Sequence, residues 1–172
     1  FTYNNRITIW KEPLQVRMRT MVRSLMHKNI AEDSTMCFPA VPDYILIFKK
    51  IGENKVKVTN TNGFKNYYGE TPLLPAMEAK YGNWEHIKVK YAKATNIGQD
   101  HLKNKLSQII WQRYASSVWD DIRNDNILPF RDSREEDDEK HVHPLQLDVI
   151  DRIVELYSNP NEVVLTPFMG VG

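Results

Sequence analysis

An apolar stretch that runs into a glycine-rich turn places the strongest constraint on the fold of this chain. Val163, Val164 and Leu165 predict a buried β-strand, and Thr166-Pro167-Phe168-Met169-Gly170-Val171-Gly172 follows it. Gly170 and Gly172 permit positive φ and let backbone come close to a ligand. Open α/β sheets present backbone to nucleotide-like ligands at such strand ends, although an ordinary strand-to-helix turn has the same local sequence. The stretch therefore favours an α/β fold with a ligand at this turn.

A helix is predicted just before this strand, from Pro144 to Tyr157, because Pro144 suits a first helical turn. Ile150, Ile153, Val154 and Tyr157 follow helical spacing and predict the buried face. The residues expected to face away are Asp148, Asp151, Arg152 and Glu155.

The first half of the chain predicts two strands, Arg6–Trp10 and Asp43–Lys50, separated by a helix from Pro13 to about His27. Asp43–Lys50 is a continuous apolar run, which is typical of a strand in a sheet covered on both faces. A further helix is expected from His101 to about Ser116.

Between Lys55 and about Asp100 the sequence shows no periodicity, and lysines alternate with aromatic residues. From Lys55 to Lys105 there are nine lysines against four acidic residues, which is a mild indication of a polyanionic partner. Lysines can contact phosphates and aromatic rings can stack on bases, so the segment predicts a nucleic-acid surface. The residues predicted to contact DNA are Lys65, Tyr67, Tyr68, Lys80, Trp84, Lys88 and Lys90. An insertion that packs its aromatic side chains inward is the alternative. The helix face with Arg17, Arg19 and Arg23 is a second candidate for phosphate contacts, or else a solvated surface.

Cys37 is the only cysteine, which excludes an intrachain disulfide and fits a reducing, cytoplasmic setting. No apolar run approaches the ~20 residues that span a bilayer, so we expect no membrane association. His141 and His143 alternate in an acidic loop, but the loop offers no third ligand of convincing spacing, and we expect no metal site.

Several motifs in the second half of the chain occur in a fixed order. His143-Pro144-Leu145-Gln146 opens the predicted helix, Ser158-Asn159-Pro160 follows it, and Pro167–Gly172 follows the predicted strand. This order resembles the cofactor half of amino-directed DNA methyltransferases with the circularly permuted, β-type arrangement. Four further segments resemble phage-type members of the family: Arg6–Lys11, Asp43–Lys50, Tyr114–Ile122 and Arg134–Pro144. The resemblance fails between about Lys55 and Gln108, as expected for a target-recognition insertion.

The resemblance implies a partial class I, Rossmann-like S-adenosylmethionine-dependent methyltransferase sheet. It divides the chain into catalytic-half strands and helix (1–54), a recognition insertion (55–108) and a cofactor-binding half (109–172). By resemblance, S-adenosylmethionine would contact His143, Pro144, Leu145, Gln146, Thr166, Pro167, Phe168, Gly170 and Gly172. Thr166 departs from the family pattern, because most relatives carry Asp there, and it keeps an oxygen acceptor without the charge.

The implied activity is site-specific methyl transfer from S-adenosylmethionine to N6 of adenine or N4 of cytosine in double-stranded DNA, with a cognate restriction endonuclease as a candidate partner. The family's catalytic Asp/Ser/Asn-Pro-Pro-Tyr/Phe motif does not occur in these 172 residues. We therefore expect an internal fragment of a bacterial or phage enzyme that transfers no methyl group alone and contains no catalytic residue. A DNA-binding relative without catalysis and, on the glycine turn alone, a dinucleotide-binding oxidoreductase half-domain are the alternatives.

Overall fold

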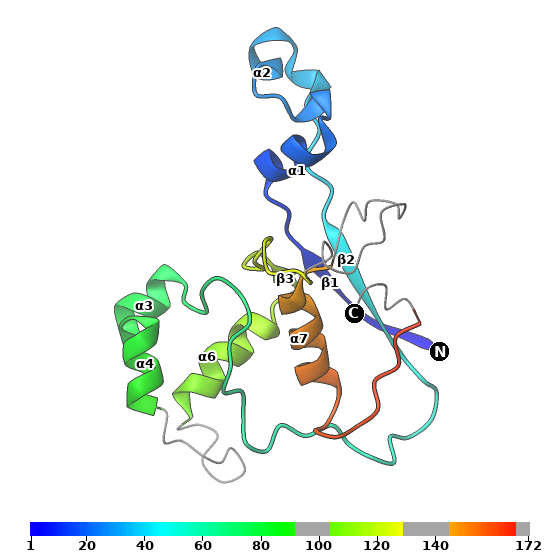
Figure 1. Cartoon of the computed structure of the whole chain (residues 1–172), viewed down its shortest axis with the longest axis vertical. Coiled ribbons are helices and arrows are strands. Elements are labelled where there is room, and N and C mark those ends of the chain that lie inside the picture. Colours follow the sequence, from blue (N-terminus) through cyan, green and yellow to red (C-terminus); the bar gives the residue numbers. More distant parts are fainter. Residues whose placement is uncertain (92–103, 129–144, 168–172) are drawn as a thin grey trace, which may run out of the picture. The chain divides into compact units, whose positions relative to one another are not determined.

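The structure is a computed structural model that describes residues 1–91, 104–128 and 145–167. It is mixed α/β and divides into two compact units (Figure 1). The sheet unit consists of Phe1–Gly52 and Ser116–Asp120, and the helical unit consists of Glu53–Ala115 and Asp121–Gly172.

The sheet unit is built on three strands in the order β2-β1-β3. β1 (Thr2–Ile9) pairs antiparallel with β2 (Asp43–Lys49) and parallel with β3 (Val118–Trp119). The alternation of side chains along β1 buries Ile7 and Ile9, and Trp119 beside them is also buried. Both strands predicted in the first half of the chain are therefore present, and β1 begins four residues earlier than the predicted Arg6.

The expectation that β2 is covered on both faces is wrong for the described structure. Tyr44, Leu46 and Phe48 on one face are each about half exposed, and only Ile45 and Ile47 on the other face are partly buried. The apolar run cannot distinguish an inner strand from an edge strand, and β2 is an edge of the described sheet.

Short helices connect β1 to β2. α1 (Pro13–Thr20) begins at Glu12, whose carboxylate accepts hydrogen bonds from the amides of Leu14 and Gln15. The predicted helix to His27 is too long, because Met21 adopts φ 54° and ends α1. The rest of the connection contains η1 (Arg23–Leu25), α2 (Asn29–Glu32) and η2 (Ser34–Met36). None of these four helices has a buried residue.

The helical unit contains α3 (Pro75–Tyr81), α4 (Trp84–Tyr91), α6 (Lys105–Tyr114) and α7 (Leu147–Tyr157). Its core consists of Phe64, Leu73, Ile87, Leu106, Ile109, Ile110 and Tyr114. α6 confirms the helix predicted after His101. α3 and α4 correct the prediction of an aperiodic segment: they span seven and eight residues, which is too short for a helical period to emerge. None of the described helices combines the length and apolarity needed to cross a membrane.

Candidate functional site

α7 is the centre of the candidate site, and its buried face differs from the predicted one. Ile150, Val154 and Tyr157, predicted to be buried, are each more than a third exposed. The fully buried residues include Asp148 and Arg152, both expected to face solvent. Hydrophobic periodicity failed here because both charges are paired inside the helical unit.

Asp148 attaches the first turn of α7 to the segment that follows β3. Its carboxylate accepts hydrogen bonds from the backbone amide and guanidinium of Arg123 at 2.9, 3.0 and 2.5 Å, and from Asn126 Nδ2 at 2.8 Å. Burial alone would raise the pKa of Asp148, but these hydrogen bonds outweigh it and lower the pKa. The carboxylate is therefore ionised and holds the start of α7.

Arg152, one turn further along α7, is 0% exposed and lies among aromatic rings and a carboxylate. Its guanidinium donates to both oxygens of Asp121 at 3.0 and 2.8 Å and to the carbonyl of Tyr68 at 2.6 Å. It lies 5.2 Å from the ring centroid of Tyr67 and 4.9 Å from that of Tyr114. A bidentate buried pair of this kind fixes both direction and distance. Arg152 thus joins α7 to residues 67–68 and to Asp121.

The predicted cofactor residues at the start of α7 are described in part. Gln146 is buried, caps α7 in an extended conformation and forms an isolated antiparallel bridge with Ile127. Leu145 beside it is half exposed. The helix therefore begins at Leu147, three residues later than Pro144, and His141, His143 and Pro144 lie outside the described residues.

The strand predicted over residues 163–165 is not formed in the described structure. Val163 is 96% exposed, and Thr166 and Pro167 are exposed as well. Strand propensity needs a paired neighbour, and none of the described segments pairs with this one. Phe168, Gly170 and Gly172 lie outside the described residues, so the structure brings only Leu145, Gln146, Thr166 and Pro167 of the predicted cofactor set into view.

The predicted DNA-binding aromatic residues are largely engaged in packing. Tyr67 stacks on Tyr114 at 5.8 Å, meets Trp84 edge-on at 6.1 Å, and its hydroxyl donates to Thr71 O and accepts from Arg152. Tyr68 and Trp84 are partly buried against the core. These rings follow the inward-packing alternative that the sequence left open.

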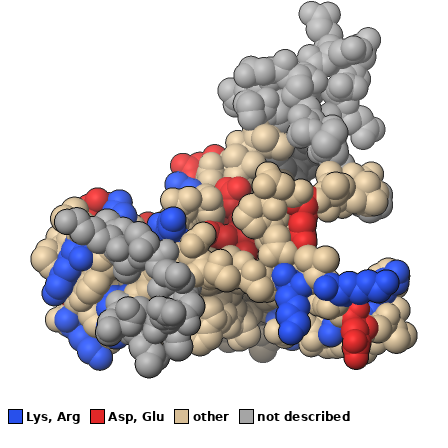
Figure 2. All heavy atoms as spheres, turned by 90° about the horizontal axis from the view of Figure 1, so that it is seen from below, with Lys and Arg blue, Asp and Glu red and all other residues tan. Residues whose placement is uncertain are grey.

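The lysines, in contrast, lie on the surface. Lys65, Lys80 and Lys90 are exposed, and Lys80 and Lys90 extend over the rings of Tyr81 and Tyr91. Lys88 pairs with Glu85 at 2.6 Å and lies over Trp84. Figure 2 shows basic side chains on the left, where α3 and α4 lie, and a further group on the right. Of the residues predicted to contact DNA, the aromatic ones thus pack against the core and the lysines are exposed.

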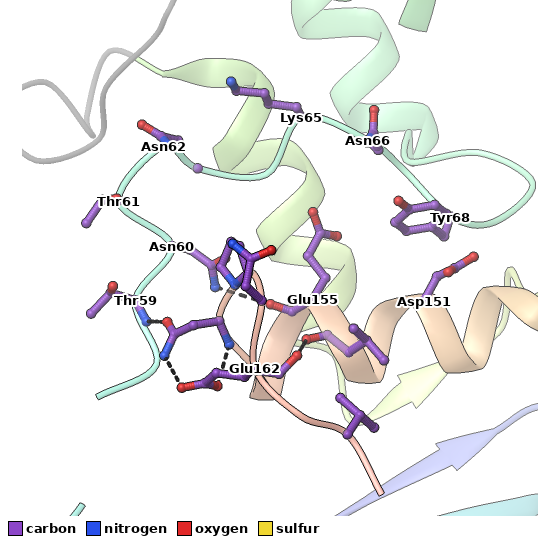
Figure 3. Close-up of a pocket in the computed structure, with 17 residues that line it drawn as sticks. Thr59, Asn60, Thr61, Asn62, Lys65, Asn66, Tyr68, Asp151, Glu155 and Glu162 are labelled. Carbon is purple, nitrogen blue, oxygen red and sulfur yellow. Dashed lines mark hydrogen bonds between the residues drawn. The ribbon is translucent and has the colours of Figure 1, made fainter. Parts of the chain in front are cut away.

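A hollow of about 650 Å³ lies between residues 59–68 and the C-terminal half of α7. In Figure 3, Asp151 and Glu155 extend from α7 toward this loop, which carries Asn60, Lys65 and Tyr68. Burial raises the pKa of Glu155 to about 7, against a lowering by its hydrogen bond with Tyr114. Glu155 Oε2 is buried and has no hydrogen-bond partner among the described residues. Glu155 is therefore partly protonated near neutral pH.

Comparison with known proteins identifies the family. All of residues 1–172 match the model of the N6_N4_Mtase family, described as DNA methylase. The chain belongs to the amino-directed DNA methyltransferases. No curated protein and no solved structure matches it significantly.

The family expected from the motif order is therefore confirmed, and this methyltransferase is a DNA-modifying enzyme by family. Sequence reasoning missed Asp121, Asp148 and Arg152, which form the polar core around α7. The signal in the sequence was weak: Asp148 and Arg152 are charged residues on a predicted helix. Hydrophobic periodicity alone places charged residues on the side that faces solvent.

Proposed function

We propose that this methyltransferase transfers a methyl group from S-adenosylmethionine to the exocyclic amine of adenine or cytosine in double-stranded DNA. The observation that carries the proposal is the match of the whole chain to the DNA methylase family. The order of His143–Gln146, Ser158–Pro160 and Pro167–Gly172 in the sequence supports the choice of cofactor. We also propose the Rossmann-like class I architecture, of which the described sheet would form a part.

Leu145, Gln146, Thr166 and Pro167, with His143, Pro144, Phe168, Gly170 and Gly172, are the proposed cofactor-binding residues. The described part fits this assignment in its chemistry. α7 is an eleven-residue helix whose N-terminal end carries partial positive charge suited to a carboxylate such as that of methionine, although the amides of Leu147 and Val149 already donate to the carbonyls of Asn126 and Gln146. Leu145 offers an exposed apolar side chain beside this helix end. S-adenosylmethionine, when bound, supplies the electrophilic sulfonium methyl group.

The proposed DNA surface consists of the exposed lysines Lys65, Lys80 and Lys90, with Lys88 beside them. Phosphate contacts by lysine set affinity and orientation without reading sequence. Because Tyr67 and Trp84 pack inward, we assign them to holding this surface rather than to stacking on a base.

The decisive experiment measures transfer of tritium from methyl-labelled S-adenosylmethionine to DNA by the full-length protein, followed by nucleoside analysis. N6-methyladenine or N4-methylcytosine in the digest is the expected result and distinguishes the two target bases. DNA binding without any methyl transfer would refute the enzyme and favour the non-catalytic relative.

The recognition role of residues 55–108 is tested by exchanging this segment with that of a relative of different specificity. The methylated sequence should follow the segment. Unchanged specificity would contradict the assignment.

A further inference from the structure

The loop of residues 57–70 is held by side chains that come from distant parts of the helical unit. It contains no helix or strand, and sheet ladders therefore do not fix its backbone. It includes Lys65, Tyr67 and Tyr68, three of the residues predicted to contact DNA. What fixes this loop bears directly on how the DNA surface is formed.

Asn159, just after α7, holds the beginning of the loop. Its Oδ1 accepts from the amide of Thr59 at 2.9 Å, and its Nδ2 donates to the carbonyl of Lys57 at 3.1 Å (Figure 3 shows the contact with Thr59). Glu162 fixes the Asn159 amide group in turn, since its carboxylate accepts from Nδ2 at 2.8 Å and from the backbone amide at 2.7 Å. One asparagine side chain thus binds both a backbone amide and a backbone carbonyl of the loop, as a neighbouring β-strand would.

Arg152 holds the end of the loop. Its Nε donates to the carbonyl of Tyr68 at 2.6 Å while the rest of the guanidinium binds Asp121. The next residue, Gly69, has φ 151°, and a Cβ there would collide with the guanidinium and lie 2.8 Å from the carbonyl of Asp121. The backbone approaches Arg152 so closely that only glycine fits.

α6 holds the middle of the loop. Ser107 Oγ accepts from the amide of Phe64 at 2.9 Å. The hydroxyl of Tyr114 accepts from the amide of Tyr68 at 3.0 Å and donates to the carbonyl of Asn66 at 3.3 Å. The loop is therefore fixed at its start, middle and end by side chains that lie 43 to 102 positions away in the sequence.

We propose that Arg152 and Asn159 are positioning residues for DNA recognition, which hold the 57–70 loop in its DNA-binding conformation. Both lie outside the predicted recognition segment. Arg152 is on α7, the helix that begins beside the proposed cofactor residues, and Asn159 follows the end of that helix. A loop that is ordered before binding loses less conformational entropy on contact with DNA, so its order raises affinity and discrimination. This inference rests on the proposed function.

The test compares Asn159→Ala with Ser158→Ala in the full-length protein. Asn159 is solvent-accessible, so its removal should leave the fold intact. Among the described residues, the Ser158 hydroxyl bonds only to Val154 O of α7, which makes Ser158→Ala a matched control. DNA affinity is measured by fluorescence anisotropy, KM and kcat by methyl transfer, and cofactor affinity by titration with S-adenosylhomocysteine. Thermal unfolding is followed in parallel.

We expect Asn159→Ala to weaken DNA binding and raise KM for DNA about threefold to tenfold, as for the loss of one or two hydrogen bonds. Affinity for S-adenosylhomocysteine should stay within about twofold of wild type, because none of the loop contacts named above involves the first turn of α7. If Asn159 had a purely structural role, the variant would have a lower melting temperature, but DNA binding would not be weakened selectively over cofactor binding.

Arg152→Lys gives a second, stronger perturbation. Lysine cannot bind Asp121 in the bidentate manner and also reach the carbonyl of Tyr68, so the loop end is released. We expect a larger loss of DNA affinity than in Asn159→Ala, with more methylation at sequences other than the preferred one, measured by sequencing of modified bases.

Equal DNA affinity of Asn159→Ala and Ser158→Ala would overturn the inference while wild-type methylation still supports the proposed function. Absence of methyl transfer by the wild-type protein would instead refute the proposed function, and the anisotropy comparison would still decide whether these residues position the loop.

Discussion

Single residues set the geometry of the helical unit, and Gly69 shows how strictly. Its φ of 151° is open to glycine, and the space where a Cβ would project is occupied by Arg152 and Asp121. Gly69→Ala should therefore lower the free energy of unfolding by about 2–4 kcal/mol in chemical denaturation. Gly52→Ala is the matched control, because Gly52 also has positive φ, 117°, with nothing within 4 Å of its Cβ position. If both variants lost the same free energy of unfolding, backbone strain alone would explain the need for glycine at position 69, and the nearby Arg152 and Asp121 would not contribute.

Glu155 gives the residue scale a second prediction, in its dependence on pH. Burial raises its pKa from the ordinary 4.5 to about 7, so the folded state binds the proton more tightly than the unfolded state does. The resulting contribution to stability is fully present below about pH 4.5 and is lost as the pH rises through 7. As the pH rises from about 5 to about 8, Glu155→Gln should therefore become more stable relative to wild type. A difference in melting temperature that does not change over this range would contradict a buried, titrating carboxyl group.

At the scale of elements, α7 shows that a helix can be located from sequence while its orientation is mistaken. Val149 is buried and Val154 is 40% exposed, although periodicity placed Val154 on the buried face. Val149→Ala should cost about 1.5–3 kcal/mol through lost burial and a residual cavity, whereas Val154→Ala should stay within about 0.5 kcal/mol. Denaturant unfolding of the two variants measures this directly. The reverse order of costs would restore the orientation expected from periodicity.

At the scale of the whole molecule, the exposed lysines determine how DNA binding depends on salt. Each lysine–phosphate contact contributes about −0.9 to the slope of log K against log salt concentration. The triple change Lys65→Ala, Lys80→Ala and Lys90→Ala should therefore reduce the slope by up to about 2.7 in anisotropy titrations. The triple change Lys28→Ala, Lys49→Ala and Lys50→Ala removes the same net charge and is the control, since no DNA contact is assigned to these lysines. An unchanged slope in the triple variant would exclude the surface with Lys65, Lys80 and Lys90 as the DNA interface.

The sequence by itself determined the family, β2, α6 and the approximate extents of β1 and α7, because these depend on motifs and on apolar runs within about ten residues. It also placed the proposed DNA surface in the segment where the lysines are exposed. It missed α3 and α4, whose one or two turns give too little periodicity, and it left open whether Tyr67 and Trp84 pack inward.

Only the tertiary structure decided which face of α7 is buried and what holds the 57–70 loop. Arg152 forms hydrogen bonds with Asp121, 31 positions away in the sequence, and Asn159 forms one with Lys57, 102 positions away. A charge is expected in solvent unless its partner is known, since burial without a partner is costly. The partners here come together only when the chain folds. The polar core of this methyltransferase therefore cannot be predicted from a local sequence pattern.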